Sequence, residues 1–264
     1  MKTKTMIAVL ATTIIALGTA DTFANAAQAA TAYCHGYRTT IVGSGRVLGT
    51  SGNDVIYLTG SGFVSSYSGD DIICGSDGHD AIDSSYGVDH IYGNGGSDTI
   101  NGGPGMDFIL GDAGDDIIKG GTGGDMLNGG EGDDTVFSQS GNDRVVGGAG
   151  DDQLIGGAGA DSLMGSTGND LLNGESGNDL LLGGAGNDLL YGGDGDDRLG
   201  GNDGNDQLNG DNGTDTLYGG TGDDVVHGDN GDDYAFGNDG DDAVIGGEGD
   251  DTVDGGSGTN TVTD

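Results

Sequence analysis

The chain has 264 residues, of which 62 are glycine and one is proline, and its 45 acidic side chains outnumber seven basic ones to give a formal net charge of −38. This charge opposes collapse and this much glycine raises the entropy lost on folding, so two outcomes remain: a disordered polyanion, or a repeat fold held by bound cations. Because so acidic a surface repels nucleic acid and anionic membranes, we expect neither as a partner.

Residues 1–30 have the order of a secretory signal peptide. Lys2 and Lys4 precede an apolar run over 6–17, and small residues follow. The run is shorter than the ~20 residues that a membrane span needs, so we predict cleavage and no membrane insertion. Two alternative small-x-small sequences place the cleavage near 26–30. The predicted location is secreted, extracellular.

Residues 31–68 are predicted to form an irregular N-terminal cap that contains one degenerate repeat, G-T-S-G-N-D-V-I-Y at 49–57. The interval from Asp54 of this repeat to Asp71 is one residue short of two nonapeptides, so the register of the later repeats loses one residue near Phe63.

Two cysteines, Cys34 and Cys74, lie beyond the predicted cleavage region. In an oxidising compartment they are expected to form a disulfide that ties the N-terminal segment to the first repeats. The alternative is a pair of free thiols.

An aspartate recurs every nine residues from Asp71 to Asp251, and Asn260 takes the next position. Each is preceded two residues earlier by glycine and followed two residues later by an aliphatic residue, with Ala235 as the one small substitute. A disordered linker has no reason to keep this register. The repeat therefore predicts an ordered, stacked structure.

We predict an all-β fold, a right-handed parallel β-roll (β-solenoid), over residues 69–264. Two nonapeptides would form one coil with two short strands, and coils would stack at ~4.8 Å with the aliphatic residues inside. Aliphatic burial alone is too small to offset the glycine entropy and the charge. Calcium would supply the difference, because Ca²⁺ takes about six to eight oxygen ligands from carboxylates and backbone carbonyls, which glycine-rich turns expose.

Stacking places the turn of one nonapeptide beside the turn of the second nonapeptide after it, so a cation could bridge them. Roughly twenty Ca²⁺ sites would bring positive charge close to the charge to be neutralised. The candidate metal ligands are Asp71, Asp80, Asp98, Asp107, Asp116, Asp125, Asp134, Asp152, Asp161, Asp170, Asp179, Asp188, Asp197, Asp206, Asp215, Asp224, Asp233, Asp242 and Asp251.

The repeats at 147–155, 183–191 and 219–227 fit the pattern G-G-x-G-x-D-x-U-x, where U is aliphatic. They resemble the calcium-binding nonapeptides of the repeats-in-toxin (RTX, hemolysin-type) family over about residues 69–262. The resemblance implies a parallel β-roll with Ca²⁺ in its turns, and disorder without calcium. The chain departs from the pattern where serine replaces the leading glycine, and we expect weaker or missing sites at Ser66, Ser84 and Ser138.

Other chemistry finds little support. The sequence has no EF-hand loop and no GxxxxGK[ST] phosphate motif, and the four histidines have no zinc spacing. We therefore predict a non-enzymatic, secreted calcium-ion-binding protein, an extracellular matrix or surface component. The alternative is a calcium-dependent surface adhesin, or a polysaccharide-acting enzyme built on the roll.

One predicted sheet carries more outward apolar side chains than the other, three residues after each aspartate. This column predicts self-association, and the alternative is ordinary tolerance of exposed β-forming residues in strands. Its apolar members are Tyr92, Leu110, Met164, Leu182, Tyr218 and Phe236.

Overall fold

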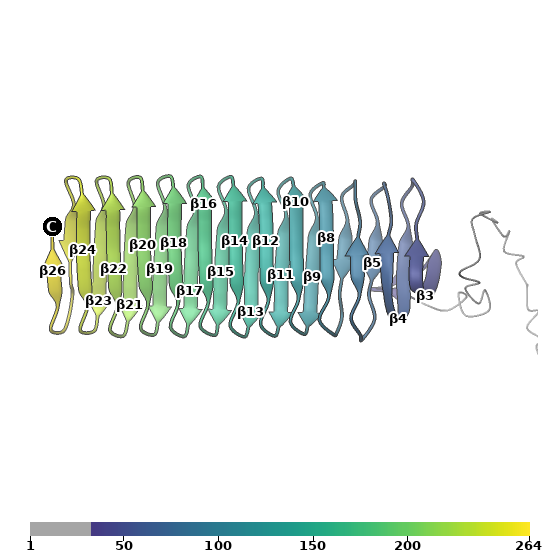
Figure 1. The fold of residues 1–264 in the computed structure, drawn as a ribbon, viewed down its shortest axis with the longest axis horizontal. Helices are drawn as coiled ribbons and strands as arrows, with labels where there is room; N and C mark the ends of the chain where they lie inside the picture. Colours follow the sequence, from purple (N-terminus) through teal and green to yellow (C-terminus); the bar gives the residue numbers. More distant parts are fainter. Residues whose placement is uncertain (1–32) are drawn as a thin grey trace, which may run out of the picture.

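The computed structural model describes residues 33–264, so the predicted signal peptide lies outside the described residues. Over this range the chain forms 26 strands and no helix. The strands wind into coils that stack along one axis into a straight rod, from the purple N-terminal end to the yellow C-terminal end (Figure 1). Within 33–264 there is accordingly no helix with the length and apolar character of a membrane span.

The strands follow one another with short turns between them. The N-terminal strands are β1 (Tyr33–Cys34), β2 (Tyr37–Arg38), β3 (Ile41–Leu48), β4 (Val55–Ser65), β5 (Ile72–Cys74), β6 (Ala81–Asp83) and β7 (His90–Tyr92). The regular strands are β8 (Thr99–Pro104), β9 (Phe108–Ala113), β10 (Ile117–Thr122), β11 (Met126–Glu131), β12 (Thr135–Ser140), β13 (Arg144–Ala149), β14 (Gln153–Ala158), β15 (Ser162–Thr167), β16 (Leu171–Ser176), β17 (Leu180–Ala185), β18 (Leu189–Asp194), β19 (Arg198–Asp203), β20 (Gln207–Asn212), β21 (Thr216–Thr221), β22 (Val225–Asn230), β23 (Tyr234–Asp239) and β24 (Ala243–Glu248), and the chain ends with β25 (Thr252–Asp254) and β26 (Thr261–Thr263).

Each regular strand pairs in parallel with the strand two further along the chain. Ile117 of β10 lies opposite Thr135 of β12 on one side and Thr99 of β8 on the other, an offset of two nonapeptides each way. Odd-numbered and even-numbered strands therefore build the two walls of one solenoid, which confirms the predicted parallel β-solenoid. The strands β8 to β24 are longer than predicted, since the residues that follow the aliphatic position, glycines included, continue the ladder.

The aliphatic residue of each repeat points into the solenoid and forms its core. Ile73, Ile118, Leu163 and Leu208 are at most 1% exposed, and the small Ala235 is buried in the same row. Parallel sheets need both faces covered, and here each wall covers the inner face of the other. The core therefore consists of one aliphatic side chain from each repeat, contributed alternately by the two walls along the rod.

The turns depend on glycine where the chain reverses. We number the repeat from its first glycine, so that glycines occupy positions 1, 2 and 4, the aspartate position 6 and the aliphatic residue position 8. At position 4, Gly150 has φ +135°, and a Cβ added there would overlap the carbonyl oxygen of Gly132 one coil earlier. Only glycine combines this φ with this closeness. Position 2 also takes positive φ but accepts other residues, such as Asn202 and Asp211.

The N-terminal segment contains four strands, β1 to β4. A small hairpin of β1 and β2 is antiparallel, and β3 pairs in parallel with β4 to make the first coil, with one bulge. Along β4 the offset to the next coil is one residue short of two nonapeptides at Tyr57 and two full nonapeptides at Phe63, which is the predicted loss of one residue. The division of the chain at residue 68 remains a prediction.

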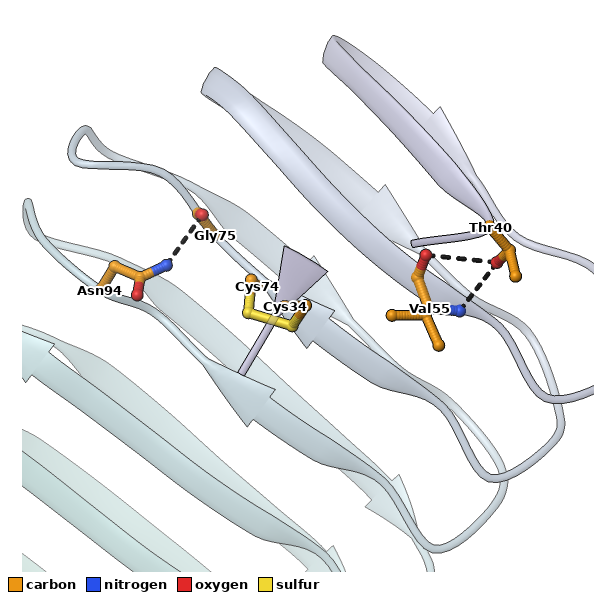
Figure 2. The surroundings of a disulfide bond; sticks show 6 residues. All are labelled: Cys34, Thr40, Val55, Cys74, Gly75 and Asn94. Atoms are coloured by element: carbon orange, nitrogen blue, oxygen red, sulfur yellow. Dashed lines mark hydrogen bonds between the residues drawn. A yellow bond between two sulfur atoms is a disulfide. The ribbon is translucent and has the colours of Figure 1, made fainter. Parts of the chain in front are cut away.

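The two cysteines form the disulfide that the sequence left open. Cys34 of the hairpin is bonded to Cys74 of β5, and no free cysteine remains in residues 33–264 (Figure 2). Beside it, the Asn94 side chain donates a 2.9 Å hydrogen bond to the carbonyl oxygen of Gly75, across neighbouring coils (Figure 2). The hairpin is further held by the ring of His35, which stacks on Tyr92 with centroids 3.7 Å apart.

Candidate metal sites

The position-6 aspartates form two columns, one along each edge of the rod. Their side chains point inward and are nearly all buried, and those from Asp98 to Asp233 are at most 3% exposed. The first column contains Asp71, Asp89, Asp107, Asp125, Asp143, Asp161, Asp179, Asp197, Asp215, Asp233 and Asp251. The second contains Asp80, Asp98, Asp116, Asp134, Asp152, Asp170, Asp188, Asp206, Asp224 and Asp242, and Asn260 continues it.

One carboxylate oxygen of each aspartate has a structural partner. The main-chain N–H of Asp152 donates to Oδ1 of Asp170 over 2.8 Å, and the N–H of Asp170 donates to Oδ1 of Asp188 over 2.8 Å. The same bond links successive coils along both columns. A turn cannot continue the sheet ladder, so the side chains satisfy N–H groups that would otherwise be buried without partners.

The second carboxylate oxygen has no such partner. At twenty aspartates Oδ2 is buried without any hydrogen bond, although buried polar atoms are rarely left unpaired. These residues are Asp71, Asp89, Asp98, Asp107, Asp116, Asp125, Asp134, Asp143, Asp152, Asp161, Asp170, Asp179, Asp188, Asp197, Asp206, Asp215, Asp224, Asp233, Asp242 and Asp251.

At twelve of these aspartates a second oxygen lies beside the same position, on the inner side of the position-1 glycine. A Cβ added at Gly156 would lie 2.7 Å from Oδ2 of Asp161 and 2.9 Å from the carbonyl oxygen of Gly174 in the next coil. The missing side chain thus leaves a space that is bordered by a carboxylate oxygen and a carbonyl oxygen. We call this space the glycine slot. It contains acceptors and no donor, which is the chemistry that a hard cation requires.

The electrostatics favour the same conclusion. Burial raises the pKa of Asp98 to about 7; the N–H of Asp80 lowers it, and repulsion from Asp116 and Asp80 in the adjacent coils raises it further. The pKa values of Asp170 and Asp215 are likewise raised to about 7, mainly by burial. A row of buried carboxylates that repel one another is costly when ionised, and a bound cation would remove that cost.

The residues present fit calcium rather than zinc. Among residues 33–264 no three His, Cys, Asp or Glu side chains gather into a metal cluster. A cation in a column would therefore take carboxylate oxygens from the aspartates and its other ligands from main-chain carbonyls. Oxygen-only coordination of this kind suits Ca²⁺, while zinc prefers nitrogen and sulfur.

Two aspartates depart from this arrangement because a hydroxyl residue at position 2 lacks the positive φ of the other turns. Oδ2 of Asp80 accepts hydrogen bonds from the N–H of Ser76 at 2.7 Å and from its hydroxyl at 3.0 Å. Thr50 makes the same two bonds to Asp54, at 2.7 Å and 3.0 Å. Asp80 was among the predicted ligands. A serine at position 2 alone does not identify such a turn, because Ser166 also occupies position 2 but keeps positive φ, and Oδ2 of Asp170 is unpaired.

Three further aspartates have serine instead of glycine at position 1. Each serine hydroxyl occupies the glycine slot and donates to a carbonyl oxygen of the next coil. Burial raises the pKa of the neighbouring aspartate, and the serine lowers it by a smaller amount. The bonds are Ser66 to Ser84 (2.8 Å), Ser84 to Gly102 (2.7 Å) and Ser138 to Gly156 (2.6 Å), beside Asp71, Asp89 and Asp143. Asp89 and Asp143 were not among the predicted ligands, yet their Oδ2 atoms are buried and unpaired like the others.

The predicted outward column lies on the wall of the odd-numbered strands. The rings of Tyr218 and Phe236 stack with centroids 5.2 Å apart and an interplanar angle of 11°. Tyr218 is 49% exposed, and Met126 and Tyr234 on the same wall are about equally exposed. Tyr92, in contrast, is covered by the ring of His35.

Comparison with known proteins gives a consistent result. The profile of the RTX calcium-binding nonapeptide repeat matches residues 42–61 and, in overlapping copies, residues 63–262. No curated protein matches the chain. The match covers most of the sequence and the same coils that contain the aspartate columns, so the chain belongs to the RTX calcium-binding nonapeptide repeat family.

Proposed function

We propose that the protein is an exported, non-enzymatic calcium-binding rod in which Ca²⁺ binds along both aspartate columns. The observation that carries this proposal is the set of twenty buried Oδ2 atoms without hydrogen bonds. In a metal-free roll each of them is a desolvated, unpaired charge. Bound Ca²⁺ would pair the Oδ2 atoms that lie beside a position-1 glycine and would cancel much of the formal charge of −38.

Calcium would then act as a structural ligand that decides whether the chain is folded. Because a cation that binds only the folded state stabilises it by mass action, the roll should form as the calcium concentration rises. Affinities of extracellular calcium modules lie at about 10⁻⁴–10⁻³ M, so folding is expected in that range. This is the calcium level outside the cell, which agrees with the predicted signal peptide and with an extracellular matrix or surface role.

The test is a calcium titration of the mature chain, followed by circular dichroism and small-angle scattering. We expect an extended coil in EDTA and a cooperative change to a rod with β structure as Ca²⁺ is added, reversed by chelator. Mg²⁺ at the same concentration is the control, since it keeps its water ligands and should be much less effective. A compact β spectrum in EDTA at neutral pH, unchanged by calcium, would refute the proposal.

A second part of the proposal concerns self-association through the outward apolar column. The stacked rings of Tyr218, which is half-exposed, and Phe236, which is partly buried, favour it, because an aromatic pair of this kind gains from exclusion of water by a facing surface. We propose a second copy of the rod as the partner. The Tyr218→Ser, Phe236→Ser double variant should lower the apparent mass in calcium from dimer to monomer in light scattering. A wild-type protein that is monomeric in calcium at all concentrations would remove this part and leave calcium binding untouched.

A further inference from the structure

Hydroxyl side chains are concentrated in the first turns of the roll. Each of the first four position-6 aspartates, Asp54, Asp71, Asp80 and Asp89, has a serine or threonine at position 1 or 2 that interacts with its carboxylate or fills its slot. After them the position-1 residue is glycine in every repeat but that of Asp143. The two ends of the rod are therefore built with different turn chemistry.

At Asp80 the protein itself satisfies the whole carboxylate. Oδ2 accepts from the N–H and hydroxyl of Ser76, and Oδ1 accepts the N–H of Gly62 at 2.6 Å. The regular turns have positive φ at position 2, but Ser76 and Thr50 do not. Their N–H groups can therefore turn toward the carboxylate. A cation has little to contribute where both oxygens already have donors.

At Asp71 and Asp89 the serine acts differently, because it blocks the slot and leaves Oδ2 of the aspartate without a hydrogen bond. The hydroxyls of Ser66 and Ser84 occupy the glycine slot and satisfy the carbonyl oxygen that borders it. The slot is then filled by protein atoms, and one of the two oxygens that would hold a cation is already paired.

Charge and covalent structure separate the same region from the rest. Residues 33–92 carry seven acidic and two basic side chains, a net charge of −5, while residues 93–264 carry 37 and three, a net charge of −34. The net negative charge per residue in the first segment is less than half of that in the second. The Cys34–Cys74 disulfide and the stacking of His35 on Tyr92 also fall within residues 33–92.

We propose that residues 33–92 form a calcium-independent nucleus, in which hydroxyl groups replace the metal, and that the glycine-slot coils of residues 93–264 add to it in order as calcium binds. A solenoid coil is stable only against a neighbouring coil, so an end that is folded before calcium arrives offers the first template. The second half of this proposal rests on the proposed function, and the first half does not.

The test is hydrogen–deuterium exchange with mass spectrometry on the oxidised, full mature chain. In EDTA, amides of β3 to β7 (residues 41–92) should exchange at least about ten-fold more slowly than those of residues 93–264. As calcium is raised, protection should extend from β8 toward β26. Equal and fast exchange of both segments in EDTA would overturn the nucleus while leaving calcium-driven folding intact. Protection of both segments in EDTA would instead refute the proposed function.

Matched variants test the role of the hydroxyl groups. Ser76→Gly at position 2 with Ser84→Gly at position 1 gives two turns of the nucleus the glycines of the regular repeat. The double variant should lose the protection of residues 41–92 in EDTA and keep it in calcium. Ser138→Gly makes the same position-1 change as Ser84→Gly in the middle of the rod and should leave exchange in EDTA as in the wild type. If the double variant keeps its protection in EDTA, or loses it in calcium too, the hydroxyl groups do not replace the metal.

Discussion

Replacement of one buried aspartate by asparagine separates the two tasks of its carboxylate. In Asp170→Asn the retained Oδ1 can still accept the N–H of Asp152, now 2.8 Å away, while Oδ2 becomes an amide nitrogen that cannot bind a cation. Asn260 shows that this residue fits the column, because its Oδ1 accepts the N–H of Asp242 at the same 2.8 Å. Any loss of stability therefore reports on Oδ2.

The expected magnitude follows from the lost interaction. An interaction with a charged group contributes about 1.5–3 kcal/mol, so Asp170→Asn should lower the free energy of unfolding in calcium by about that amount. Asp170→Ala also leaves the N–H of Asp152 buried without an acceptor, which costs a further ~1–3 kcal/mol. Urea titrations at saturating calcium, followed by circular dichroism, measure both differences.

The control is Asp151→Asn at position 5, which removes the same charge from an exposed side chain that accepts the N–H of Asn169 at 2.7 Å. It should change stability in calcium by no more than ~0.5 kcal/mol. The reasoning is wrong if Asp170→Asn is as stable as the wild type in calcium, or more stable. That result would mean that the carboxylate contributes only its hydrogen bond and that its negative charge destabilises the folded protein even when calcium is present.

Three further predictions concern pH, glycine and the disulfide. Burial raises the pKa of buried aspartates such as Asp98, to about 7 in the folded roll against an ordinary value of 3.8, so the folded state binds more protons and the metal-free roll should lose stability as pH rises from about 4 to about 7. In EDTA the β signal should therefore be strong at pH 5 and fall at pH 8 to that of the N-terminal coils, and a pH-independent spectrum would contradict this. Gly168→Ala should prevent the calcium-induced transition, since Gly168 has φ +136° and an added Cβ would overlap the preceding coil. Gly200→Ala should fold normally, because its Cβ would meet only the flexible tip of Leu182 at 3.2 Å. Equal behaviour of the two variants would refute the steric argument. Loss of the disulfide in Cys34→Ala, Cys74→Ala, which opens a separation of 40 residues, should destabilise the N-terminal coils by up to about 4 kcal/mol and spare the distal ones, as peptide-level exchange would show.

The solenoid could be predicted from the sequence alone, because the same nine-residue period determines both the position of each turn and the residue that is buried in the core. A repeat of nine residues that alternates glycine turns with an aliphatic residue such as Leu163 has no other way to bury that residue. The length of the strands was underestimated, because two glycines in succession look like a turn, and only the structure shows the ladder running on from Leu154 to Ala158. The one-residue change of register along β4 was visible as the spacing of Asp54 and Asp71.

The candidate site was predicted at the level of residue type but not of atoms. Spacing identifies the aspartates, yet it does not say that they point inward or that Oδ1 of Asp170 is already engaged by the neighbouring coil. The differences between turns could be predicted only in part. Serine at position 1, as in Ser84, departs visibly from the repeat pattern. The effect of Ser76 at position 2 depends on whether that residue adopts positive φ, which the sequence does not show.

Two positions of the repeat show whether the position-6 aspartate is needed for its hydrogen bond or for its charge. At position 5 a second ladder runs along the outside of the turns, and there aspartate and asparagine alternate freely, as in Asp151, Asn169, Asn187 and Asp223. An amide oxygen evidently accepts such a bond as well as a carboxylate does. At position 6 the residue is aspartate in every repeat from Asp71 to Asp251, although this side chain is buried and ionisation there is costly. If hydrogen bonding were the only requirement, asparagine would be the less costly residue inside and aspartate the better one outside. Aspartate at every inner position is instead what a buried cation requires, because only a negative charge gains from the cation.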